Sequence, residues 1–203
     1  DLVYWASACG GCCVSVLDVH ESLFDVVEAA DLVFWPIALD IKYKDVEDMP
    51  DGHIDVTLFN GAVRNSENEH MAHLLRKKSK VLVAYGSCSH LGGIPGLANF
   101  SDKESILKRV YEDSESTENP EKIRPQTEFE VKEGILDIPE FFNDVKTLDQ
   151  VVNVDYYLPG CPPQTERLVE VFMAIVKGEE LPPPGSVVGA FDKTQCDECE
   201  RKK

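Results

Sequence analysis

The sequence predicts an α/β fold built on a flavodoxin-like, doubly wound parallel sheet. Short apolar runs alternate with segments whose apolar positions recur at helical spacing, which is typical of βαβ units. Most of these runs end at Gly, Pro or Asn-Gly, as expected where strands give way to loops. The length of 203 residues suits one domain with a short appendage.

Four apolar runs in the first half of the chain predict the first strands of the sheet. They cover residues 1–5, 31–37, 53–61 and 80–86. Two segments between them predict helices, at 12–30 and at 64–78. Basic residues fill the last turn of the second helix, where they complement the helix dipole.

The second half begins with an interruption of this alternation. Residues 101–150 contain 14 acidic and 7 basic residues and the low-complexity patch YEDSESTENPE, so we expect a long excursion from the core. Residues 154–160 predict the fifth strand, and 162–178 predict a helix that starts with two prolines. The segment LPPPGS at 181–186 predicts a stiff linker.

Charge and hydropathy exclude several classes of protein. A net charge of −17 and an isoelectric point near 4.6 argue against nucleic-acid binding, which needs clustered Lys and Arg. No run approaches the roughly 18 to 20 uncharged apolar residues of a membrane span, and the chain starts without Met or a signal-peptide pattern. Seven cysteines with this spacing make a poor disulfide framework and suit a reducing compartment. We therefore expect a cytoplasmic protein that does not bind membranes.

Four of the cysteines follow predicted strands. Cys9 and Cys12 follow the first strand, Cys88 follows the fourth and Cys161 follows the fifth. The carboxyl ends of parallel strands meet at one edge of a sheet, so these thiols should lie close together. Each of them lies beside small or rigid residues, which for Cys88 are Gly86 and Ser87, and glycine lets the backbone approach a ligand. Four thiolates in such an arrangement favour a [4Fe–4S] cluster.

The residues alone leave three other interpretations of these cysteines open. Isolated cysteines are often small buried hydrophobes, although four at corresponding strand ends are harder to explain in that way. Structural zinc usually takes two local pairs, whereas this chain has one pair and two distant cysteines. A redox-active C-x-x-C motif would use Cys9 and Cys12 alone.

The cysteine motifs resemble the small subunit of [NiFe] hydrogenases. The resemblance covers most of residues 1–190 and rests on Trp5 with C-G-G-C at 9–12, VAYGSCSHLGGIPGLAN at 83–99 and YYLPGCPPQTE at 156–166. It implies that Cys9, Cys12, Cys88 and Cys161 hold the iron of a proximal [4Fe–4S] cluster. The nickel–iron active site would belong to a large subunit, so this chain would carry no catalytic residue.

Other positions resemble one cytoplasmic group within that family. Val14 stands where periplasmic members have an acidic residue, and NGAVRNSENEHMAHLLRKKSK with GGIPGLANF is similar to the methyl-viologen-reducing hydrogenase of methanogens. This resemblance implies an electron-transfer role from H2 oxidation toward a heterodisulfide reductase, rather than toward a deazaflavin coenzyme. It further implies a nickel-containing large subunit and a small [2Fe–2S] electron-transfer subunit as partners.

The tandem Cys12–Cys13 leaves an alternative open. In the related cluster-holding subunit of complex I, a tandem pair of cysteines are both ligands and the C-x-G-C pair is absent. A complex I-like subunit of a membrane-associated hydrogenase or quinone oxidoreductase is therefore the alternative function. We assign Cys9 and Cys12 as ligands and Cys13 as a buried neighbour. Of the histidines, His90 could donate a hydrogen bond to a cluster sulfide, and the others show no metal-ligand spacing.

The chain divides into two predicted parts. Residues 1–180 form the flavodoxin-like domain with the proximal cluster, and 181–203 form a linker and the start of a C-terminal cluster-binding extension. Cys196 and Cys199 are possible ligands of a further cluster, and one or two more clusters are expected if the chain continues.

The loops that carry the four cysteines lack charged side chains. They comprise residues 6–12, 87–98 and 159–164. Depletion of charge is typical of the core of a permanent interface, so we expect these loops to be buried against the large subunit.

Overall fold

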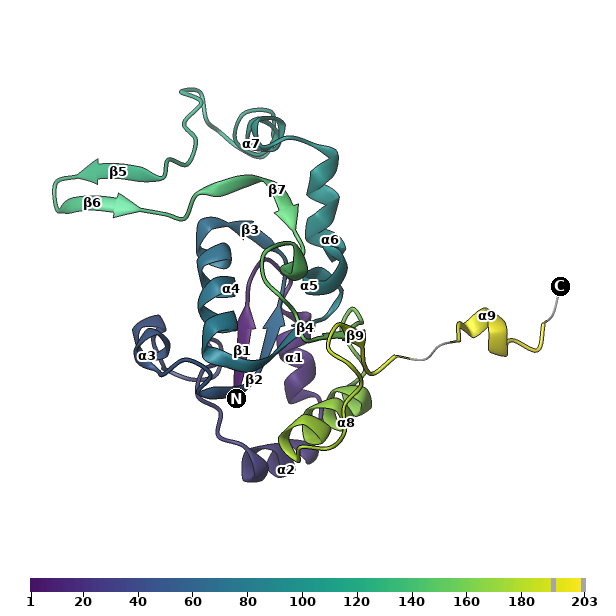
Figure 1. Cartoon of the computed structure of the whole chain (residues 1–203). Helices are drawn as coiled ribbons and strands as arrows, with labels where there is room; N and C mark the ends of the chain where they lie inside the picture. Colours follow the sequence, from purple (N-terminus) through teal and green to yellow (C-terminus); the bar gives the residue numbers. More distant parts are fainter. Residues whose placement is uncertain (191–192, 202–203) are drawn as a thin grey trace.

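The computed structural model describes residues 1–190 and 193–201. Its centre is a five-stranded, wholly parallel sheet in the order β1-β2-β4-β8-β9 (Figure 1). The strands are β1 (Leu2–Trp5), β2 (Ile54–Asn60), β4 (Ser79–Tyr85), β8 (Tyr156–Leu158) and β9 (Ser186–Val187). The central strands β2 and β4 are apolar on both sides, as expected of parallel strands that are covered on both faces. The predicted fold class is confirmed.

The apolar run at 31–37 does not form the expected strand. Phe34 makes one parallel bridge to Leu2, on the edge of β1 opposite β2. Pro36 lacks a backbone N–H and begins a turn, so pairing stops there although Phe34 is buried. The chain thus leaves β1 toward one edge and returns to β2 on the other side. Doubly wound sheets bind ligands at such a reversal of strand order.

Helices cover both faces of the sheet. One face is covered by α1 (Gly11–Leu17), α2 (Ser22–Ala29) and α8 (Thr165–Val176). The other face is covered by α3 (Tyr43–Asp48) and α4 (Ser66–Lys78). Because side chains alternate along a strand, Leu58 and Val83 pack in the first half of the core, and Phe59 and Leu82 in the second.

Two predicted helices differ from the structure at their ends. The segment 12–30 forms two helices rather than one, because the chain turns between α1 and α2 and His20 adopts a positive φ of 54°. Its apolar spacing continues across the turn, since both short helices pack on the same face of the sheet. The helix predicted from residue 162 begins at Thr165, and Pro162 and Pro163 lie in the preceding loop.

The acidic segment 101–150 leaves the core as expected, but its last residues pack against the core again. It contains α7 (Lys103–Tyr111) and a projecting hairpin of β5 (Glu128–Val131) and β6 (Gly134–Asp137) (Figure 1). It then returns through β7 (Phe141–Lys146), which pairs antiparallel with β3 (Val63–Asn65). Leu148, in the short 3₁₀ helix Leu148–Gln150, is fully buried in the core.

The prediction of a stiff linker at 181–186 is partly wrong. Ser186 pairs with Tyr156, so β9 extends the sheet, and Val188 packs in the core. The Tyr156 hydroxyl also donates to the carbonyl oxygen of Pro182 over 3.1 Å. After β9, the short helix α9 (Gln195–Glu198) lies apart from the sheet (Figure 1). In the described part of the chain, every helix is too short or too polar to cross a bilayer.

Candidate iron–sulfur site

Three loops at the carboxyl edge of the sheet bring the four predicted cysteines together. Cys9 and Cys12 follow β1, Cys88 lies in α5 (Ser87–Leu91) directly after β4, and Cys161 follows β8. All four line one small cavity of about 50 Å³. The complete lining is Ala8, Cys9, Gly11, Cys12, Asn60, Ser87, Cys88, Gly160, Cys161 and Pro162. The structure therefore places the four sequence-predicted thiols around a common space.

The four thiols differ in exposure. Cys12 and Cys88 are buried against the sheet, whereas Cys9 and Cys161 are exposed at the surface. All four are free thiols. A group held by them would therefore be covered by the protein on one side and open to a partner on the other.

Two glycines let the backbone pass close to the thiols. A Cβ atom on Gly86 would lie 2.4 Å from Sγ of Cys12, and one on Gly93 would lie 2.8 Å from Sγ of Cys88. Both glycines also have positive φ angles, of 85° and 52°, which L-residues rarely adopt. These positions therefore need glycine for space as well as for conformation.

Burial keeps the inner thiols protonated when nothing is bound. Burial, followed by the charges of Cys88, Cys13, Cys9 and Cys161, raises the pKa of Cys12 to about 12. Burial also raises the pKa of Cys88, and the backbone amide of Ile94 opposes this shift. A metal centre that binds thiolates must therefore displace protons from this site.

The arrangement of the thiols suits a cluster better than a single ion. Among the described residues, no three His, Cys, Asp or Glu side chains come close enough together to hold one metal ion. Zinc would need every sulfur at about 2.3 Å from one point. A [4Fe–4S] cluster instead distributes its four thiolate ligands over four separate iron atoms. The four soft donors around a shared cavity therefore fit an iron–sulfur cluster.

The sequence motifs missed one polar residue in this cavity. Asn60, the last residue of β2, is fully buried and lines the space between the thiols. The sequence drew attention to it only as part of an Asn-Gly turn. Its place at the carboxyl end of a strand could have revealed it, because these ends meet at the same edge.

Cys13 lies beside the site without lining the cavity. It is fully buried in the core, and its Sγ lies 3.5 Å from Nδ2 of Asn60. Burial raises the pKa of its thiol, so it stays protonated as a core residue would. Its burial is consistent with a core position, and its exclusion from the ligands stays a prediction.

The remaining candidates lie outside the cavity. The ring of His90 packs against Tyr157 with a centroid distance of 4.5 Å, and its hydrogen bond to a sulfide stays a prediction. His70 and His73 are exposed on α4. Cys196 and Cys199 are exposed at α9, away from the sheet.

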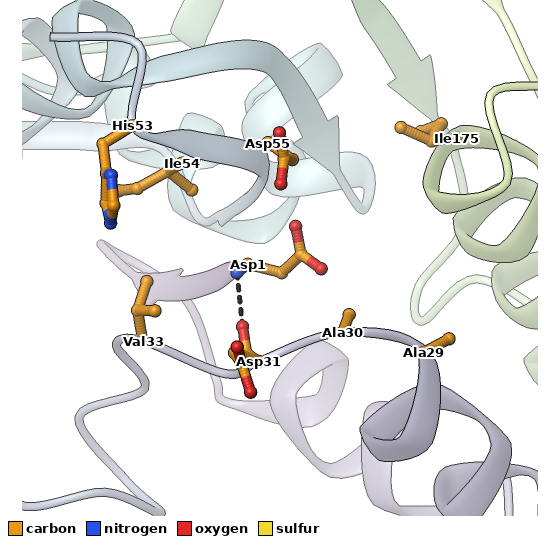
Figure 2. Close-up of a pocket in the computed structure, with 9 residues that line it drawn as sticks. All are labelled: Asp1, Ala29, Ala30, Asp31, Val33, His53, Ile54, Asp55 and Ile175. Carbon is orange, nitrogen blue, oxygen red and sulfur yellow. Dashed lines mark hydrogen bonds between the residues drawn. The ribbon is translucent and has the colours of Figure 1, made fainter.

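A larger cavity of about 460 Å³ lies at the opposite, amino edge of the sheet (Figure 2). Its charged lining includes Asp1, Asp31 and Asp55, and the amino group of Asp1 donates to the carbonyl oxygen of Asp31 over 2.6 Å. No cysteine and no strand carboxyl end contributes to it. We therefore place the functional site at the smaller cavity, where the chemistry-bearing side chains meet.

Comparison with known proteins shows which proteins this chain resembles. The chain is 45% identical over 194 residues to the iron-sulfur subunit of the F420-non-reducing hydrogenase of Archaeoglobus profundus, covering 95% of this chain and 60% of that protein. It is 37% identical over 199 residues to a subunit of the F420-non-reducing hydrogenase of Methanothermobacter marburgensis, covering 98% and 58%. The chain thus spans about three-fifths of the length of these relatives. The similarity to hydrogenase small subunits expected from the motifs is confirmed.

A solved hydrogenase structure has a similar fold. The chain superposes on a chain of an NAD+-reducing [NiFe]-hydrogenase in the H2-reduced state with a TM-score of 0.74 and 29% identity, covering 91% of this chain and 93% of that one. Residues 9–175 also match the family described as NADH ubiquinone oxidoreductase, 20 Kd subunit. This match includes all four cysteines of the cavity. The chain therefore belongs to the NADH ubiquinone oxidoreductase 20 Kd subunit family.

Proposed function

We propose that this chain is the electron-transferring small subunit of a [NiFe] hydrogenase and holds a proximal [4Fe–4S] cluster on Cys9, Cys12, Cys88 and Cys161. The observation that carries the proposal is the convergence of these four thiols, from three separate loops, on one cavity at the carboxyl edge of the sheet. The similarity to a hydrogenase iron-sulfur subunit supports the same role. The nickel–iron centre would lie in another chain.

The residues of this chain would position the cluster and set its environment. When bound, the cluster would supply one-electron transfer. Cys12 and Cys88 hold the inner side of the site against the sheet, and Cys9 and Cys161 hold the side nearest the surface. The backbone N–H of Gly11 lies 3.4 Å from Sγ of Cys9 and would help to stabilise negative charge on that sulfur.

We further propose that the chain works in a cytoplasmic complex. Its large subunit would oxidise H2 and pass electrons through this chain toward a heterodisulfide reductase-type partner, by way of a small [2Fe–2S] subunit. The similarity to F420-non-reducing subunits supports an acceptor other than that coenzyme. Purification of the complex from its host, with identification of each subunit, tests these partners.

The first test of the proposal is metal content. Anaerobically purified chain should contain about four iron and four sulfide per molecule, because one cubane holds that number. Iron and acid-labile sulfide analyses measure both quantities directly. Stoichiometric zinc without sulfide would contradict the cluster assignment.

Replacement of Gly86 by Ala should prevent the cluster from binding. The new methyl group would stand 2.4 Å from Sγ of Cys12, so the ligand would have to leave its position. Gly185→Ala is a matched control, because Gly185 has a similar φ of 90° and no atom within 4 Å of the added carbon. The control should lose only about 1–2 kcal/mol of stability from backbone strain and keep its iron. Equal iron content in the two variants would show that the close approach at Gly86 does not matter.

The alternative function is a complex I-like subunit of a membrane-associated hydrogenase or quinone oxidoreductase. The name of the matched family and the tandem Cys12–Cys13 favour it. In that arrangement both tandem cysteines would be ligands. Cys13 lies outside the cavity whereas Cys9 lines it, so we retain the hydrogenase assignment. Reduction of quinone by the purified complex would support the alternative.

We also propose that residues 181–203 lead into an extension that binds further clusters. Cys196 and Cys199 would supply two of its ligands. Both are exposed, and α9 lies apart from the sheet, so they remain accessible to additional ligands. More than four iron per chain in a protein extended to the length of the relatives would support this proposal. A Cys196→Ala variant of that longer chain should then lose only the additional iron.

A further inference from the structure

The side-chain amide of Asn60 has no role among the cluster ligands, although it occupies their cavity. Asn60 is fully buried, and backbone pairing fixes it to Trp5 of β1 and Tyr85 of β4. Its backbone carbonyl oxygen also accepts from the backbone N–H of Ala6 over 2.7 Å. A buried polar side chain that is held so firmly needs hydrogen-bond partners for its own polar atoms.

The two polar atoms of this amide are unequally satisfied. Nδ2 lies within hydrogen-bond distance of Sγ of Cys13, at 3.5 Å, whereas the buried Oδ1 has no partner among the described residues. The nitrogen and oxygen of an amide have nearly the same size, so its orientation follows from the bonds that each atom can make. A carbonyl oxygen beside thiolates would be repelled, and an N–H group in its place would be attracted.

We propose that, when the cluster is bound, the side-chain amide of Asn60 is flipped relative to the orientation that places Nδ2 beside Cys13. Nδ2 then donates a hydrogen bond to a ligand or cluster sulfur, and Oδ1 accepts a hydrogen bond from the S–H of Cys13. This inference rests on the proposed function. Both polar atoms of the amide are then satisfied, and Cys13 keeps its proton instead of becoming a ligand. Asn60 is thus a positioning residue for the cluster, and Cys13 orients Asn60 from the core side.

This arrangement has a consequence for the reduction potential. A hydrogen bond to sulfur stabilises the reduced cluster, which carries more negative charge, more than it stabilises the oxidised cluster. The pair formed by Asn60 and Cys13 therefore raises the potential. The opposite orientation would place Oδ1 toward the sulfurs and would lower it, so the sign of the change distinguishes the two orientations.

Asn60→Leu tests the donor, because leucine has a similar size and no polar atom. The variant is purified anaerobically in its complex, and the cluster is titrated with redox mediators while its EPR signal is measured. At the wild-type midpoint, the ratio of reduced to oxidised cluster should fall about tenfold, as expected when a hydrogen bond to a charged group is lost. An unchanged or increased ratio would overturn the proposal.

Cys13 provides a second test that leaves the cavity lining intact. Cys13→Ala should lower the same ratio to a smaller extent, whereas Cys13→Ser should keep it near the wild-type value because its O–H can donate to Oδ1. In the double variant with Asn60→Leu, the alanine should add nothing further. Identical titrations of Cys13→Ala and the wild type would contradict the orienting role. This pair decides the question if Asn60→Leu does not fold.

Iron and sulfide analysis of the wild type separates this inference from the function on which it rests. A wild-type chain without a cluster would overturn both. A wild-type chain that holds about four iron and four sulfide, with variants that titrate like it, would overturn only the role of Asn60 and Cys13.

Discussion

Alanine in place of Cys12 should reduce the iron content of the purified chain from about four atoms to less than one. Cys12 is buried, and its thiol lies close enough to Cys9, Cys88 and Cys161 for their charges to raise its pKa. A cluster would join three loops of the sheet, so its loss should also lower Tm, by on the order of 10 °C. Iron analysis, EPR of the reduced protein and thermal unfolding measure these effects. Alanine at Cys9, Cys88 or Cys161 should act in the same direction.

Cys13→Ala is the matched control for this experiment. It removes the same atoms from the neighbouring position of the same helix, but on the side that faces the core. It should keep its iron, and its loss of stability should be that expected from a small cavity, about 1 kcal/mol. If Cys13→Ala lost the cluster while Cys9→Ala kept it, the ligand set of the complex I-like alternative would be correct.

Phe100→Asp should separate the chain from its proposed large subunit. Beside the thiols, α5 leads into α6 (Gly93–Gly96) and the 3₁₀ helix Leu97–Phe100. Apolar side chains recur there at every third position and are 57–88% exposed: Leu91, Ile94, Leu97 and Phe100. Residues three apart on such helices share a face, so Ile94, Leu97 and Phe100 form an apolar stripe next to the site, while Leu91 precedes the break at Gly92. Large exposed apolar patches of this kind mark interaction surfaces.

The expected effect is a loss of affinity of at least about 100-fold, since a buried carboxylate would replace an aromatic side chain at the interface. Size-exclusion chromatography of the complex measures it. Phe24→Asp is the control, because Phe24 is 73% exposed on α2, which covers a face of the sheet away from the stripe. Hydrogen exchange of the loops 6–12, 87–98 and 159–164 provides a second measurement. Equal protection of these loops in the complex and in the separated chain would exclude them from the interface.

Much of the fold could be predicted because its signals are local. The apolar runs of β1, β2 and β4 stand out in the sequence, since buried parallel strands need apolar side chains on both faces. Two segments differ from their predicted structure, one because of a local turn and one because of a distant contact. Phe34 makes only one bridge because a turn follows at Pro36, and β9 is a strand only because β8 offers it a free edge.

Chain order alone was enough to specify the fold class and the four candidate ligands, because parallel strands bring their carboxyl ends to one edge and each cysteine follows a strand. The neighbours of those ligands depended on packing in three dimensions. Consecutive residues of a helix point about 100° apart, and the packing of α1 on the sheet leaves Cys12 lining the cavity and Cys13 outside it. The same packing places Asn60 beside both of them. Its contact with Cys13 joins positions 47 residues apart, and no local pattern in the sequence encodes it.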